Sequence, residues 1–362
     1  MMDRVAKLLE ALSNAYGPTG FEGPVRDIVR HELEPITDGM ETDGLGSIIA
    51  KLGRKTKTPR VMLAAHMDEV GLLVKHITPE GYLRFQLLGG LLDYAVINQR
   101  WVVLTRNGPV PGVTGLKSPH TIPMDKRNTA MFKWQEMFVD VGATSREDAE
   151  ERLSIRPGDP IAADSKFMPF AGGKHYLGKA WDDRVGVAAM VEVMRNLASK
   201  PSPNAVYGVG TVQEEVGLRG AQTASYQVKP DIGINLESGI AADHPGFTPE
   251  EAQEALGKGP GIFLHDGSML PNLKLRDFVV DVANDIGIAV QFEVLSGYGE
   301  DGAEMQRSYS GVPTINISVP TRYLHGHNSV ISRSDFDQTV TLVTEIVRRL
   351  DAETVEKLRN FD

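Results

Sequence analysis

The chain has 362 residues, of which 41% are hydrophobic, so it is long enough for a large domain and a second, smaller one. Its net charge of −10 argues against nucleic acid or an anionic membrane as partner, because both attract basic surfaces. It contains no cysteine, which excludes disulfides and thiolate metal sites. Any metal must therefore use His, Asp and Glu, a ligand set that suits Zn, Co or Mn.

The first segment predicts two amphipathic helices and carries no secretory signal pattern. Val5, Leu8, Leu9 and Leu12 recur at helical spacing, and a second helix begins near Pro24 and continues to about residue 33. No apolar stretch is long enough to span a bilayer, so we expect a soluble, cytoplasmic protein. Strands are predicted at 47–50 and 60–65.

The segment from about residue 72 to 165 has a different pattern. Short strand-like runs are separated by Gly- and Pro-rich turns, and we expect no helix before about Ser145. This pattern predicts a small all-β barrel or sandwich at 72–165, inserted into a domain made of 1–71 and 166–362. The predicted strands are 72–77, 82–87, 100–105, 110–113 and 138–141.

From Lys174 onward, strands and helices alternate, which predicts an α/β fold with a parallel sheet. Helices are expected at 182–198 and 275–286, with strands at 205–212, 232–236, 290–295 and 314–319. A final helix is predicted to open with a capping box formed by Ser334 and Asp337.

Four of the apolar, strand-like runs are followed by side chains that can bind metal. His66 and Asp68 follow the first run, Glu214 and Glu215 the second, Glu237 the third and His325 the fourth. Because ligands of open α/β sheets bind beyond the carboxyl ends of the strands, these side chains can converge.

Each of these signals has a simpler structural alternative. His66 and Asp68 point to the same side if extended, so Asp68 could orient a ligating His66, but both could also lie in a polar corner. Glu214 and Glu215, if extended, point to opposite sides, one toward a metal and one toward substrate; the alternative is a solvated acidic turn.

Three further positions leave a choice between neighbouring residues. At the start of the helix at 182–198 we interpret Asp183 as the cap and Asp182 as a carboxylate bridging two cations. Asp243 and His244 compete with Glu237 as ligands, and His327 competes with His325. In combination, the carboxylates and histidines predict a hydrolytic centre with two metal ions.

Four motifs in this order resemble the M42 family of metallo-aminopeptidases, which includes the tetrahedral (TET) and glutamyl aminopeptidases. They are AHMDEVG at 65–71, GKAWDDR at 178–184, QEEVGLRG at 213–220 and RYLH at 322–325. The resemblance covers essentially the whole chain, and the QEEVGLRG motif is the most specific. It implies a three-layer α/β/α metallopeptidase domain with an inserted β-barrel that forms dimers.

The resemblance also implies a role for each site residue. His66 and Glu237 would hold one divalent ion, Glu215 and His325 the other, and Asp182 would bridge the two ions. Glu214 would be the general acid/base, with Asp68 behind His66. The expected activity is release of N-terminal residues from short peptides, by an enzyme assembled from dimers into a tetrahedral dodecamer.

The chain departs from the family pattern at three points. Glu237 stands where an Asp is common, and His325 is followed by Gly326-His327 instead of a Ser. The segment Gly299-Glu300-Asp301-Gly302 replaces Gly-Thr-Asp-Ala in a loop expected near the substrate. Two other functions stay open from the residues: a related metal-dependent amidohydrolase or deacylase, and a non-catalytic scaffold stabilised by its metals.

Overall fold

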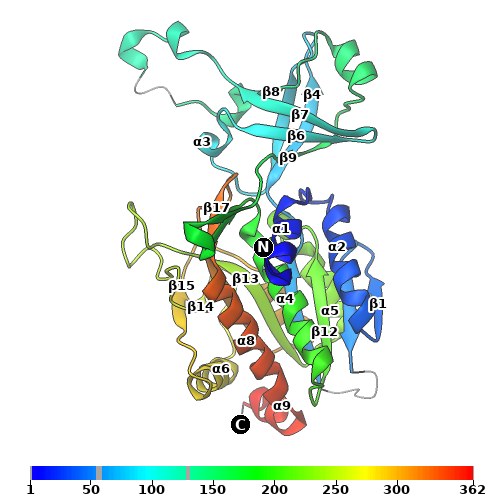
Figure 1. Ribbon diagram of the computed structural model, residues 1–362, viewed down its shortest axis with the longest axis vertical. Helices are drawn as coiled ribbons and strands as arrows, with labels where there is room; N and C mark the ends of the chain where they lie inside the picture. Colours follow the sequence, from blue (N-terminus) through cyan, green and yellow to red (C-terminus); the bar gives the residue numbers. More distant parts are fainter. Residues whose placement is uncertain (1, 54–58, 128–130, 362) are drawn as a thin grey trace.

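The structure is a computed structural model that describes residues 2–53, 59–127 and 131–361. It has an α/β/α domain that contains both termini and a closed, six-stranded barrel that stands at one end of that domain (Figure 1). Among the described residues, no helix is both long enough and apolar enough to cross a membrane.

The central sheet is mostly parallel in its middle and antiparallel at its edges. β12, β3, β13 and β16 lie side by side and run in the same direction, so their carboxyl ends share one edge of the sheet. The strands of this sheet are β1 (Gly39–Thr42), β2 (Ile48–Leu52), β3 (Arg60–His66), β10 (Met168–Phe170), β11 (His175–Gly178), β12 (Ala205–Thr211), β13 (Ile232–Ile240), β14 (Gly261–His265), β15 (Gln291–Val294), β16 (Thr314–Arg322) and β17 (Ser329–Ser332).

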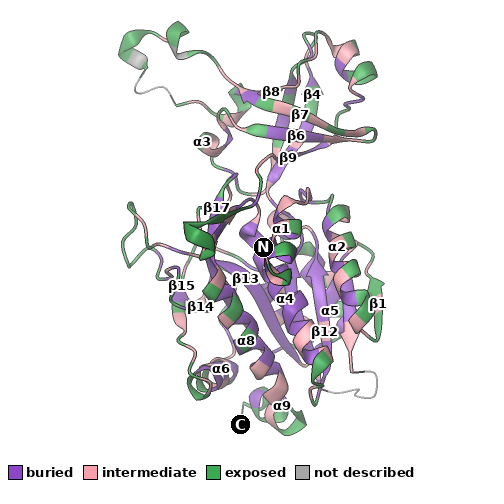
Figure 2. Cartoon of the chain, in the orientation of Figure 1, coloured by how far each residue is buried: buried purple, intermediate pink, exposed green. Residues whose placement is uncertain are grey.

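Helices cover both faces of the sheet. One face carries a large apolar core beneath α4, whose residues are buried along most of its length, and the other face packs against α5 and α7 (Figure 2). The helices of this domain are α1 (Arg4–Asn14), α2 (Gly23–Leu33), α4 (Trp181–Ser199), α5 (Arg219–Val228), α6 (Leu273–Asp285), α7 (Gly302–Gln306), α8 (Arg333–Arg349) and α9 (Ala352–Arg359).

The barrel has its own core, built around Trp101, Phe85 and Ile161. Its strands close in the order β4-β5-β8-β7-β6-β9. They are β4 (Gly71–Ile77), β5 (Leu83–Leu88), β6 (Arg100–Thr105), β7 (Gly108–Gly115), β8 (Phe138–Asp140) and β9 (Pro160–Ala163). The expectation of no helix before about Ser145 is wrong for α3 (Asp93–Val96), one α-helical turn that connects β5 to β6. Short 3-10 turns also lie at Pro119–Thr121, Met124–Lys126 and Trp134–Glu136.

The predicted cap of the final helix is also wrong. Ser332 caps α8 by accepting a hydrogen bond from the backbone N–H of Asp335, and Asp337 pairs with Arg333 instead. The helix begins two residues earlier than the Ser334 pattern suggests, because β17 runs directly into it. A separate helix, α9, then follows α8 after the cap Asp351.

Candidate metal centre

The shared edge of the parallel strands brings the predicted site residues together. His66 is the last residue of β3, and His325 follows the end of β16. The prediction that Glu237 ends its strand is wrong, since β13 continues to Ile240. Its pairing with β3 nevertheless stops at Asn235, and Glu237 lies level with the last residue of β3, with Oε1 3.6 Å from Nε2 of His66.

Asp182, in the first turn of α4, lies between the two histidines. Its Oδ1 is 2.9 Å from Nε2 of His66, and its Oδ2 is 3.1 Å from Nε2 of His325. The carboxylate of Asp182 therefore faces both imidazoles, one with each oxygen.

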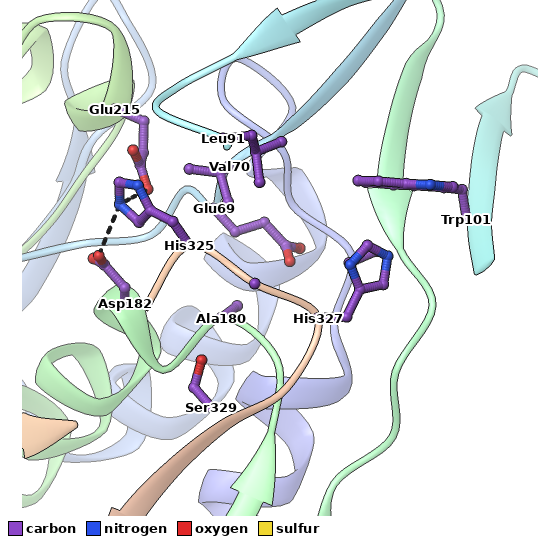
Figure 3. Close-up of a pocket in the computed structure, with 12 residues that line it drawn as sticks. Glu69, Val70, Leu91, Trp101, Ala180, Asp182, Glu215, His325, His327 and Ser329 are labelled. Atoms are coloured by element: carbon purple, nitrogen blue, oxygen red, sulfur yellow. Dashed lines mark ion pairs between the residues drawn. The ribbon is translucent and has the colours of Figure 1, made fainter. Parts of the chain in front are cut away.

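The five predicted ligands form two groups that share Asp182. His66, Asp182 and Glu237 make the first group, and Asp182, Glu215 and His325 make the second. Within each group, one potential ligand atom from every residue lies within 4.8 Å of the others. Each group has the donor types and spacing to hold a divalent ion. Figure 3 shows His325 directed at Asp182 and Glu215.

Asp183 acts as the cap predicted from the sequence. Its Oδ1 accepts a hydrogen bond of 2.9 Å from the backbone N–H of Gly186, inside the first turn of α4. Its Oδ2 accepts one of 3.1 Å from the backbone N–H of His66. Asp183 thus ties the start of α4 to the end of β3, which fixes Asp182 beside His66.

Asp68 connects His66 to the segment that contains the two glutamates. Its Oδ1 is 3.5 Å from Nδ1 of His66, longer than an ordinary N–H···O hydrogen bond. The same carboxylate accepts hydrogen bonds from the backbone N–H groups of Glu214 at 3.0 Å and Glu215 at 3.2 Å, and from Oγ1 of Thr19 at 2.9 Å.

The two glutamates are not extended, contrary to the sequence-based interpretation. Glu214–Val216 forms a turn of 3-10 helix after β12, and the αL conformation of Gln213 turns the chain into it. Glu215 still reaches the second group, with Oε1 3.5 Å from Nε2 of His325. Oε2 of Glu214 lies 3.9 Å from Nε2 of His66 and completes the wall of the site.

The protonation properties of these groups indicate a shortage of positive charge. Burial raises the pKa of Glu215 to about 8 and that of Glu214 well above its ordinary range. Burial opposes the charged form of His66, but the carboxylates of Glu237 and Glu214 outweigh it and raise the pKa well above its usual value. Burial also opposes the charged form of His325, but the carboxylates of Asp182 and Glu215 outweigh it and raise the pKa of His325 to about 10. Buried carboxylates in this number call for cations.

The competing ligand candidates lie elsewhere. Asp243 forms a bidentate ion pair with Arg322 at 2.6 Å, and His244 packs against the rings of Phe247 and Tyr323. His327 is directed away from both groups, toward Trp101 (Figure 3). None of the three belongs to a metal-ligand group found among the described residues.

Two parts of the site were not predicted. Glu69 is buried between Lys179 at 2.7 Å and Arg184 at 3.3 Å, and it lines a small cavity together with residues of the second ligand group. The only signal for it in the sequence was the presence of both cations beside the acidic pair at 182–183. The second part is the backbone carbonyl of Gly90, in the barrel segment, which faces His325. No sequence pattern marks a contact made by a backbone group.

A cleft of about 230 Å³ opens onto the centre. Besides the six ionisable residues of the site, it is lined by Gly90, Leu218, Gly297, Tyr298 and Gly299. The loop at 299–302 thus reaches the cleft through Gly299 only, while Glu300 and Asp301 are fully buried behind it.

The model of a family described as M42 glutamyl aminopeptidase matches residues 46–342 of the chain. The chain belongs to the M42 family of peptidases. The chain is therefore an aminopeptidase, because it belongs to this family and resembles named aminopeptidases over nearly its full length. This result favours a hydrolytic enzyme over a non-catalytic scaffold. As a metallopeptidase family, M42 implies a divalent metal, and the two ligand groups fit that requirement.

Relatives extend this M42 assignment over nearly the whole chain. The lysyl aminopeptidase of Pyrococcus furiosus is 35% identical, with coverage of 95% of this chain and 97% of that protein. The TET aminopeptidase of the marine sediment archaeon Thaumarchaeota archaeon SCGC AB-539-E09 superimposes with a TM-score of 0.95 at 41% identity, covering 98% and 99% of the two chains. The TET1 peptidase of Pyrococcus horikoshii, solved as a dodecamer and able to assemble into a tetrahedron or a large octahedral shell, has a TM-score of 0.86 at 30% identity, covering 96% and 100%.

Proposed function

We propose that this M42 aminopeptidase releases N-terminal residues from short peptides with the help of two divalent ions. His66 and Glu237 would hold one ion, Glu215 and His325 would hold the other, and Asp182 would be shared by both. The observation that supports this proposal best is the position of Asp182, whose two carboxylate oxygens face two different histidines at 2.9 and 3.1 Å. A carboxylate shared between two ligand groups is the arrangement that a co-catalytic pair of ions needs.

The donor set fits hard or borderline divalent ions. It consists of two imidazoles and three carboxylates, which suit Zn or Co, with Mn as a further candidate. Oε1 of Glu215 is buried without a hydrogen-bond partner, as expected of an oxygen that is free to bind an ion. When bound, such ions would polarise the scissile carbonyl and lower the pKa of the attacking water.

Glu214 is the group that moves the proton in this proposal. Its carboxylate belongs to neither ligand group, and it lines the cleft 3.9 Å from Nε2 of His66. As general base it takes a proton from the attacking water, and as general acid it delivers that proton to the leaving amine.

Asp68 and Asp183 position the reacting groups. Asp68 holds the backbone of the turn at 214–216 and lies behind His66, so it fixes Glu214 and the imidazole relative to each other. Asp183 holds the backbone of His66 against the start of α4. Neither carboxylate belongs to the two ligand groups.

The experiment that tests this proposal measures hydrolysis of aminoacyl-anilides. EDTA should abolish turnover of the wild-type enzyme, and Zn or Co should restore it. Glu214→Gln should lower kcat by about 10² to 10⁴, the usual contribution of general acid–base catalysis, while both ions remain bound. Wild-type turnover in Glu214→Gln would exclude Glu214 as the base, and turnover resistant to EDTA would exclude the metal requirement.

We further propose that the barrel is the dimerisation module and that dimers assemble into a tetrahedral dodecamer. The proposal is supported by the likeness to TET peptidases and by exposed apolar side chains on the barrel and its extensions, such as Tyr94, Met124 and Met131. An enclosed assembly would restrict access to peptides short enough to enter.

A further inference from the structure

The loop that carries His325 has a conformation that needs support from outside. Tyr323 and His325 both have positive φ values, +64° and +54°, in the left-handed region that side chains other than glycine rarely adopt. Such conformations persist where the surrounding structure holds them in place. The contacts of this loop therefore decide where the imidazole of His325 lies.

The barrel supplies the contact that orients the imidazole. Nδ1 of His325 lies 2.7 Å from the backbone carbonyl oxygen of Gly90, in the segment that follows β5. Since a carbonyl can only accept, Nδ1 carries the hydrogen and donates it. Nε2 is then unprotonated in the neutral ring and faces Asp182 and Glu215 as a potential ligand atom.

The barrel segment lies so close to the centre that a side chain at Gly89 or Gly90 would press on the ligands. A Cβ added to Gly90 would lie 3.2 Å from Nδ1 of His325. A Cβ added to Gly89 would lie 2.9 Å from Oε2 of Glu215 and 2.7 Å from Cγ1 of Val70. Both glycines therefore form a wall of the second ligand group, that of Asp182, Glu215 and His325.

His327 fastens the other end of the same loop to the barrel. Its Nε2 donates a hydrogen bond of 2.9 Å to the carbonyl oxygen of Arg100, and its ring meets that of Trp101 edge-on at 4.4 Å. Trp101 is itself fixed by a 3.0 Å hydrogen bond from Nε1 to Oγ1 of Thr114. A cavity of only about 20 Å³ separates this contact from His325 (Figure 3).

We propose that Gly90 and His327 are positioning residues through which the barrel holds His325 for one ion of the pair. The barrel then has a second task besides assembly, since it completes the ligand group of Asp182, Glu215 and His325. The other group, with His66 and Glu237, receives no such contact from Gly90 or His327. This inference rests on the proposed dinuclear centre.

The test is a calorimetric titration of Zn into the metal-free, full-length enzyme. The wild type should bind two ions, and a wild type that binds none would refute the dinuclear centre itself. Gly90→Ala and His327→Leu should each weaken one of the two binding events by about 10- to 100-fold, the usual effect of removing a group that orients a metal ligand. The other event should keep its wild-type affinity.

Two control variants separate positioning from general damage. Gly44→Ala, at an exposed glycine with no atom near the added Cβ, should bind both ions as the wild type does. His327→Gln should recover most of the lost affinity, because its side-chain N–H can reach the carbonyl that Nε2 reaches. The visible absorption of bound Co, which reports coordination geometry, should change in Gly90→Ala and not in Gly44→Ala.

The proposal is overturned if Gly90→Ala and His327→Leu bind both ions with wild-type affinity. It is equally overturned if both binding events weaken to the same extent, since that would indicate a general loss of structure. If His327→Leu does not fold, the comparison of Gly90→Ala with Gly44→Ala decides the question alone.

Discussion

The shared carboxylate of Asp182 depends on contacts made by its neighbours in the sequence. Asp183 caps α4 and holds His66 at the same time, so adjacent acids have separate structural and chemical tasks. Asp68 similarly organises the turn that presents Glu214 and Glu215. At the scale of single residues, the centre is a set of buried acids whose backbone partners fix their orientation.

One buried acid outside the centre makes stability depend on pH. Glu254 is almost fully buried beside Ser318, and burial raises its pKa to about 8 from 4.5. Between these two pH values the folded state keeps a proton that the unfolded state releases, so stability falls as pH rises through this window. The side chain of Glu254→Gln does not titrate, so this loss should be absent from the variant. The difference in the free energy of unfolding between variant and wild type should therefore grow from pH 5 to pH 8, by up to about 1.4 kcal/mol per pH unit.

Urea unfolding of both proteins at several pH values measures this difference. The exposed Glu250→Gln serves as the matched control and should follow the wild type throughout. A constant stability difference between Glu254→Gln and the wild type from pH 5 to pH 8 would contradict the assignment.

The residues of the centre were easier to predict than their geometry. The apolar runs pointed to His66, Glu215, Glu237 and His325, and the start of a helix added Asp182. The resemblance to the M42 family singled these five out as ligands, and the structure brings all five together. The opposite directions assigned to Glu214 and Glu215 assumed an extended chain, which the left-handed residue Gln213 interrupts. The carbonyl of Gly90 could not be predicted, because a backbone contact between distant segments leaves no pattern in composition.

At the scale of elements, the long, strongly periodic segments were predictable and the short ones were not. The helix expected at 182–198 is α4 at Trp181–Ser199, and the four parallel strands are where the apolar runs predict them. The strands β10, β11 and β17 at one side of the sheet have three or four residues each, too few for a recognisable alternation. The helix α5 was missed because its polar sequence follows a left-handed N-cap at Leu218.

The elements that shape the cleft make a prediction about specificity. Of the described residues that line it, none is Lys or Arg, while four are Asp or Glu. An acidic N-terminal side chain would find no cationic side chain there. Leucyl- and lysyl-anilides should therefore be hydrolysed with a kcat/KM at least about 10-fold above that of glutamyl-anilide, equivalent to about 1.4 kcal/mol.

Substitutions of Leu218, which lines the cleft, provide the control for this prediction. Leu218→Arg should raise the relative rate for glutamyl-anilide, whereas Leu218→Met should leave the order of substrates unchanged. A wild-type preference for glutamyl-anilide would show that specificity is set by groups outside the described cleft.

At the scale of the whole molecule, the barrel and the α/β/α domain meet at the proposed metal centre. The contacts of Gly90 and Arg100 with the loop at 323–327 join the two parts beside the ligands. Light scattering of the intact protein should give twelve times the mass of one chain if dimers assemble into a tetrahedron. A stable monomer at micromolar concentration would contradict the proposed assembly.

The most direct test of the account is the position of the ions themselves. Anomalous diffraction from crystals of the zinc-loaded enzyme should show two peaks per chain, both in contact with Asp182. One peak should lie beside His66 and Glu237, and the other beside Glu215 and His325. A single peak, or two peaks that do not share Asp182, would contradict the dinuclear centre.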